Sequence, residues 1–115
     1  MDWPGVESRE SREALLRALS RNASWWAEYV QDQLEGRAED EDVSEAFAIL
    51  RSALDAARER EALLDVTRWL LVGLTHSALV ALDGGSADCP TMEVRDSDGK
   101  SLGDALHEEW PDFAP

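Results

Sequence analysis

Apolar residues recur at helical spacing through the first third of the chain. Between residues 7 and 35 a line of apolar positions advances by three or four residues at a time: Leu15, Leu19, Ala23, Trp26, Val30 and Leu34. Charged side chains, including Arg12 and Arg17, lie off that line. This pattern is typical of an amphipathic helix with one buried face. Gly36 is suitably placed to end it, so we expect one long helix over 7–35.

Two further helices are expected in the middle of the chain. Asp42 and Glu45 resemble a capping box, and apolar positions at helical spacing follow them, which predicts a second helix over 43–60. The polar run at 58–61 interrupts the pattern, and a third helix is expected over 62–82. Because that helix is apolar on nearly every side after Trp69, we expect it to be the buried centre of the core.

The last thirty residues have a different pattern. Residues 92–95 alternate between apolar and polar, Asp98-Gly99 is a strong tight-turn signal, and Leu102 is the next apolar position. This arrangement predicts a short β-hairpin, followed by a helical turn before a proline. We therefore predict a mainly α protein, a three-helix bundle with a small β-hairpin and helical-turn appendage over 91–112.

Length and composition limit the class of protein. The chain has 115 residues, enough for one small domain, and 43% of its residues are hydrophobic, including five Trp, so a folded core is expected. Its single cysteine, Cys89, cannot form an internal disulfide, and the first residues lack the pattern of a signal peptide, which indicates the cytoplasm. The longest apolar stretch, 69–82, is shorter than the roughly 20 residues that span a bilayer, so no membrane contact is expected.

The net charge of −14 is concentrated in two segments. Residues 35–45 contain six acids and one base, and residues 83–115 contain nine acids and two bases. Such a charge repels nucleic-acid phosphates and anionic lipids, so direct nucleic-acid binding is not expected. A basic protein partner would be attracted.

Carboxylates at helical spacing raise the possibility of metal chemistry. All-α nucleotide pyrophosphohydrolases hold Mg²⁺ with E-x-x-E on one helix and E-x-x-D on the next, because hard cations bind several converging carboxylate oxygens. The nearest equivalents are Glu10, Glu13, Glu61 and Asp65, whose spacing departs from that pattern. Acids at the start of a helix are also explained by the helix dipole. A magnesium-dependent nucleotide hydrolase is therefore an alternative, and we expect no enzyme, metal or cofactor.

The two histidines and the cysteine show no tight spacing of the kind that binds zinc. His76 lies in the most apolar segment and is expected to be a buried, neutral residue. His107 lies beside acidic residues, which favour its protonated form. Cys89 follows Asp88 and precedes Pro90, so it has no positive neighbour to activate it as a nucleophile.

Large aromatic side chains and acidic segments are the remaining candidates for function. Trp25 and Tyr29 are four residues apart and share a helix face, either as core that covers the hairpin or as an exposed patch. Trp and Tyr are enriched at interface hot spots, and acids steer basic partners. The expected partner-binding residues are Trp25, Tyr29, Asp40, Glu41, Glu108 and Trp110.

Short motifs in the last third carry a family resemblance. They are Leu82-Asp83-Gly84-Gly85, then Val94-Arg95-Asp96 with Asp98-Gly99, and finally Ala105-Leu106-His107-Glu108-Glu109-Trp110. This LDGG turn and LHE-x-aromatic pattern resembles small uncharacterised bacterial proteins, some of them immunity-like. The resemblance implies no activity. Together with the charge, it favours an immunity- or antitoxin-like module that occludes a basic surface of a protein partner, with a structural homodimer as an alternative.

Overall fold

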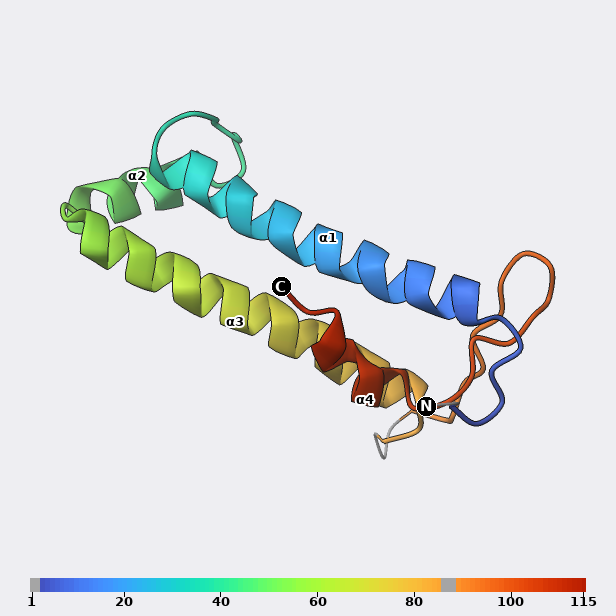
Figure 1. The fold of residues 1–115 in the computed structure, drawn as a ribbon. Coiled ribbons are helices and arrows are strands. Elements are labelled where there is room, and N and C mark those ends of the chain that lie inside the picture. The colour runs from blue at the N-terminus through green and yellow to red at the C-terminus, as the bar shows by residue number, and fades with distance from the viewer. Residues whose placement is uncertain (1–2, 86–88) are drawn as a thin grey trace. The chain divides into compact units, whose positions relative to one another are not determined.

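The computed structural model describes residues 3–85 and 89–115, and those residues form a mainly helical protein (Figure 1). Its elements are α1 (Arg9–Leu34), α2 (Ser44–Ala53), α3 (Ala57–Leu82), α4 (Leu106–Glu109) and the 3₁₀ turn η1 (Trp110–Asp112). The prediction of a mainly α protein is confirmed. Within the described residues there is no strand, so the predicted hairpin is wrong.

The turn of the predicted hairpin forms, but a ladder does not follow it. The Gly99 amide donates to the Asp96 carbonyl at 2.9 Å, and a single antiparallel bridge joins Arg95 to Ser101. Outside this bridge the backbone groups form hydrogen bonds with other segments of the chain. The Met92 amide donates to the Leu82 carbonyl at the end of α3, and the Ser101 carbonyl accepts from the N-terminal segment. These groups are therefore not available to extend a two-stranded ribbon.

Helix α1 matches its predicted range closely, whereas the boundary between α2 and α3 lies earlier than expected. Helix α2 ends at Ala53, and residues 58–61, which were expected to separate the helices, form the first turn of α3. Arg and Glu are good helix formers, which explains their position inside a helix. Arg60 also donates from Nε to the Leu54 carbonyl at 2.7 Å and so satisfies a carbonyl at the end of α2.

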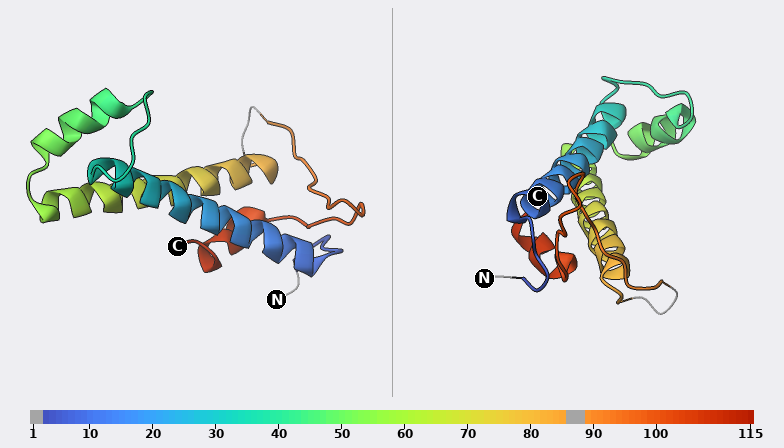
Figure 2. Two further views of the ribbon diagram at one scale, coloured as in Figure 1. Left: turned by 90° about the horizontal axis from the view of Figure 1, so that it is seen from above. Right: turned by 90° about the vertical axis from the view of Figure 1, so that its right-hand side faces the viewer.

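The chain divides into two compact units. Unit 1 consists of residues 1–21 and 72–115, and unit 2 consists of residues 22–71. In unit 1, Leu16 of α1, Leu79 of α3, Leu106 of α4 and Trp110 of η1 form a buried cluster. The C-terminal segment therefore packs against the first half of α1 and the last half of α3, as both views in Figure 2 show.

Helix α3 is not the buried centre of a core. In its 26 residues, Leu64 and Leu79 are buried, and the face carrying Trp69 is open to solvent. The prediction is wrong because it inferred burial from apolar composition, whereas burial depends on a covering element. Helix α2 has only ten residues, about 15 Å of helix against about 39 Å for α3, and none of them is buried.

Candidate functional site

Three aromatic side chains on α1 form a partly exposed cluster in unit 2, which we call the aromatic cluster. The ring centroids of Trp25 and Trp26 are 4.8 Å apart, and Tyr29 lies 5.7 Å from Trp25 and 5.4 Å from Trp26. These are favourable distances for aromatic pairs. Trp25 is 55% exposed and Trp26 is 50% exposed. Of the two alternatives for Trp25, the exposed patch is therefore correct.

Tyr29 connects the aromatic cluster to the acidic loop, defined as residues 39–42. Its hydroxyl donates to Asp40 Oδ2 at 2.8 Å, and Asp40 Oδ1 accepts from the Asp42 amide at 3.1 Å. The hydrogen bond from Tyr29 lowers the pKa of the Asp40 carboxyl and raises the pKa of the Tyr29 hydroxyl. Trp25, Tyr29 and Asp40, which were selected from separate signals, are thus brought together, and Glu41 lies exposed beside Asp40.

The other two predicted partner-binding residues belong to unit 1. Glu108 is exposed, but Trp110 is only 1% exposed, and its Nε1 donates to the Val72 carbonyl at 3.1 Å. Its indole lies in the core of unit 1 and cannot contact a partner, so the selection of Trp110 is corrected. The sequence showed a large aromatic beside acids, and only the fold shows which way it faces.

A buried arginine at the start of α1 organises unit 1. Arg12 is fully buried, and its Nε donates to Glu109 Oε2 at 2.9 Å. Its Nη1 donates to the carbonyls of Leu102 at 3.0 Å and Asp104 at 2.7 Å, and its Nη2 donates to that of Ala105 at 3.2 Å. One side chain therefore anchors the whole segment that leads into α4.

Glu109 is the acidic partner of this arginine. It is 2% exposed and also accepts from Arg9 Nη1 at 2.9 Å. Burial raises the pKa of Glu109, but the hydrogen bonds from Arg9 and Arg12 outweigh it and leave the pKa below its usual value. In the sequence, Arg12 lies off the apolar line of its helix and Glu109 lies in the acidic segment 83–115, and neither position predicted the burial that the structure shows. Arg12 lies four residues before Leu16 and shares its helix face, but Leu16 is not on the predicted apolar line, so the pattern did not indicate a buried arginine.

An aspartate and two histidines lie together at the end of α3. Asp83 Oδ2 accepts from His107 Nδ1 at 2.6 Å and from the His107 amide at 3.0 Å. In neutral His107 this arrangement places the proton on Nδ1 and leaves Nε2 as an acceptor. The rings of His107 and His76 are 5.7 Å apart, and His76 is exposed, so the expectation of a buried His76 is wrong.

In the described residues, these histidines are not part of a metal centre. Within those residues, no group of three or more His, Cys, Asp or Glu side chains is arranged to hold a metal ion. The carboxylates of the magnesium alternative are partly occupied by arginines: Glu13 is bonded to Arg9 at 3.2 Å, and Asp65 is bonded to Arg68 at 3.3 Å. The hydrolase alternative therefore gains no support from the described geometry.

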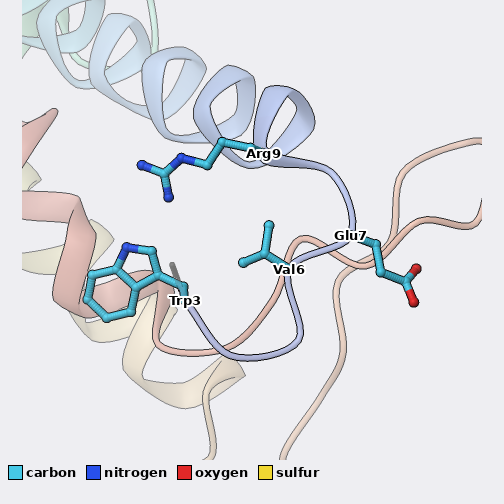
Figure 3. Close-up of a pocket in the computed structure, with 4 residues that line it drawn as sticks. All are labelled: Trp3, Val6, Glu7 and Arg9. Atoms are coloured by element: carbon cyan, nitrogen blue, oxygen red, sulfur yellow. The ribbon is translucent and has the colours of Figure 1, made fainter. Parts of the chain in front are cut away.

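Two pockets on the surface have the size of a small-ligand site. The first, in unit 1, has a volume of about 370 Å³ and is lined by Trp3, Val6, Glu7 and Arg9; Figure 3 shows Glu7 pointing away from it. Arg9 is bonded to Glu109 and Glu13, so its charge is already compensated. The second, in unit 2, has a volume of about 470 Å³ and a mixed lining: Gln31, Glu35, Asp55, Ala57, Arg60, Glu61, Leu64 and Arg68.

One side of α3 carries exposed apolar side chains at helical spacing. We call it the α3 face, and it consists of Val66, Trp69, Leu70, Gly73 and Leu74. The large side chains are 54%, 75%, 56% and 69% exposed in that order. Among the described helices, α3 alone is long and apolar enough to cross a membrane by length and composition. Its uninterrupted apolar stretch is nevertheless shorter than about 20 residues.

Comparison with known proteins adds no family to these observations. No protein-family model, no curated protein and no solved structure matches the chain. In the described residues, the exposed aromatic and apolar side chains are the most extensive surface features, and no group of three or more potential metal ligands is present among them.

Proposed function

We propose that this protein is a non-catalytic, cytoplasmic protein-interaction module that covers a basic surface of a protein partner with the aromatic cluster and the acidic loop. The observation that carries the proposal is the hydrogen bond from Tyr29 to Asp40, because it joins an exposed aromatic patch to the most acidic segment of unit 2. An immunity- or antitoxin-like role, in which the partner is a nuclease or another nucleic-acid-binding protein, fits this chemistry.

The two parts of this surface have complementary uses in binding. Exposed Trp and Tyr side chains supply large contact areas at little cost in conformational entropy, as in interface hot spots. Residues 35–45, with six acids and one base, attract a basic surface and accelerate association at low salt. Because Tyr29 holds Asp40 in place, the loop is partly organised before the partner arrives.

The three helices contribute to the proposed function as well. We propose that they form the predicted three-helix bundle only in part within one chain, since α2 buries no residue. The apolar surface that this partial bundle leaves uncovered is then available for association with other proteins.

The test is capture of a partner from lysate of the source organism by the tagged full chain, at low and high salt. We expect a stoichiometric basic protein that elutes as salt rises. Trp25→Ala and Asp40→Asn should each reduce capture at least tenfold. Matched controls are Met92→Ala and Asp98→Asn, which remove an exposed apolar and an exposed acidic side chain from the loop at 89–100.

Two results would contradict the proposal. One is that Trp25→Ala and Asp40→Asn capture the partner as well as the wild type does. The other is that Asp98→Asn weakens capture as much as Asp40→Asn, which would reduce the effect to net charge alone. Circular dichroism of each variant establishes that the helices are retained.

A further inference from the structure

Two guanidinium groups in unit 1 have the same kind of surroundings. In the described residues, each arginine that lies over an aromatic ring also pairs with a carboxylate. The two sets are Arg12 with Trp3 and Glu109, and Arg17 with Phe113 and Glu13. The Cζ atoms lie 5.0 Å and 5.5 Å from the ring centroids, and the nitrogen–oxygen distances are 2.9 Å and 3.8 Å. The ring contacts the flat face of the guanidinium and the carboxylate its edge, so one group makes both contacts.

The aromatic cluster and Asp40 in unit 2 supply the ring and the carboxylate of such a set without the arginine. In the described residues, no arginine lies over a ring of the cluster, and Asp40 forms no ion pair. The one base in residues 35–45, Arg37, is bonded to Asp32 at 2.8 Å and also pairs with Glu35. The place of the guanidinium is therefore open to a group from another molecule.

The rings of the cluster are accessible and connected to the carboxylate. Trp25 is 55% exposed and Trp26 is 50% exposed. Trp25 stacks on Tyr29 with an angle of 20° between the ring planes, and Tyr29 is the residue whose hydroxyl donates to Asp40. One side chain, Tyr29, therefore holds both the indole and the carboxylate.

The hydrogen bonds of Asp40 leave room for a forked donor. Oδ2 accepts from the Tyr29 hydroxyl and Oδ1 accepts from the Asp42 amide. An ionised carboxylate has about four acceptor sites, so each oxygen keeps a further site. A guanidinium can bond to both oxygens at once because its N–H groups form a planar fork, whereas an ammonium group acts as a point charge.

We infer that the aromatic cluster and Asp40 bind an arginine side chain of the partner protein, with its guanidinium stacked on Trp25 and its N–H groups bonded to the Asp40 carboxylate. This inference rests on the proposed function and names the group that the partner contributes. Arginine fits better than lysine because its planar group stacks on indole and is more weakly hydrated. The six acids and one base of residues 35–45 add attraction for any cation.

Titration of the isotope-labelled full chain with three amidated peptides of equal length tests this inference. The peptides alternate glycine with arginine, with lysine or with leucine, and the NMR signals of the indole N–H groups report binding. We expect the arginine peptide to shift the signals of Trp25 and Trp26 and to bind about three- to tenfold more tightly than the lysine peptide. Equal affinity for the lysine peptide would reduce the attraction to charge. Tighter binding of the leucine peptide would assign the cluster to an apolar group, and either result overturns the inference.

Two pairs of variants locate the site. Trp25→Ala and Asp40→Asn should each weaken binding of the arginine peptide at least threefold. The matched controls, Trp69→Ala and Asp98→Asn, remove an exposed indole and an exposed carboxylate elsewhere and should leave the affinity unchanged. A loss that is as large for the controls as for the site variants would overturn the inference.

Tyr29→Phe is the sharpest variant because it keeps the aromatic ring and every charge. It removes only the hydroxyl that donates to Asp40. We expect the affinity for the arginine peptide to fall about two- to tenfold, since the carboxylate is no longer held beside the rings. An unchanged affinity would contradict a guanidinium that contacts the ring and the carboxylate together.

Capture from lysate tests the proposed function separately. If capture depends on Trp25 and Asp40 but the lysine peptide binds as tightly as the arginine peptide, the proposed function stands and this inference fails. If the arginine peptide binds as expected but no protein is captured, the site for a guanidinium stands and the proposed function fails.

Discussion

Units 1 and 2 differ in how completely their buried polar side chains are hydrogen-bonded. In unit 1 the buried Arg12, Ser101 and Glu109 are all hydrogen-bonded, and the Ser101 hydroxyl, for example, accepts from the Gly103 amide at 3.1 Å. In unit 2 the buried Gln33 has a side-chain oxygen without a partner in the described residues. An unsatisfied buried group of this kind costs about 1–3 kcal/mol. Among the described residues, every buried polar side chain of unit 1 is therefore hydrogen-bonded, whereas unit 2 has one unsatisfied side-chain oxygen.

The two units also differ in how the chain builds them. Unit 1 combines the start of α1, the end of α3 and the C-terminal segment, which lie far apart in the sequence. Unit 2 is the single continuous segment 22–71, and it exposes Trp25, Trp26, Ile49 and Trp69. The comparison shows that, in the described residues, unit 1 has the better satisfied polar interior, whereas unit 2 leaves more of its large apolar side chains exposed.

The strongest test of this division is Arg12→Leu. The substitution leaves Glu109 buried with less compensation and removes a hydrogen-bond donor from the carbonyls of Leu102, Asp104 and Ala105, of which the last still accepts from the Glu108 amide at 3.0 Å. Removing one partner of a buried ion pair typically costs about 3–5 kcal/mol, and we expect that loss in the free energy of urea unfolding. The exposed Arg21→Ala should change it by less than about 0.5 kcal/mol. If Arg12→Leu and Arg21→Ala lowered the free energy of unfolding equally, the buried arginine would contribute no more to stability than an exposed one.

A pair of leucine substitutions compares the covered core with the α3 face. Leu16→Ala opens a cavity in the core of unit 1 and should cost about 2–5 kcal/mol. Leu74→Ala, at 69% exposure, should change the stability by less than about 0.5 kcal/mol. Urea unfolding measures both. A large loss for Leu74→Ala would show that another part of the protein covers the α3 face.

Acid titration gives the smallest expected effect. The pKa of Glu109 is below its usual value in the folded protein, so the unfolded chain binds more protons as the pH falls. The stability contributed by this carboxylate is therefore present above the unfolded pKa of about 4.3 and is lost as the pH falls through the folded pKa. Glu109→Gln should flatten the dependence of the urea midpoint on pH in that range. A dependence as steep as in the wild type would contradict this assignment.

The sequence by itself determined the helical content, the position of α1 and the turn at 96–99, because spacing, helix propensity and turn chemistry act within a few residues. It also identified Trp25, Tyr29 and Asp40 as candidates, though from separate signals. The boundary between α2 and α3 was missed because no proline or glycine marks it, and the contact of Arg60 with the Leu54 carbonyl, six residues earlier, leaves no pattern in the sequence.

Only the tertiary structure decided which side chains are covered. Trp110 and Arg12 became core residues because the C-terminal segment packs on the first half of α1 and the last half of α3 within unit 1, and no local pattern encodes that return of the chain. Trp69 stayed exposed although its segment is the most apolar. Periodicity reports which residues can share a face, whereas burial requires another surface to cover that face, and for α3 the described chain does not supply one.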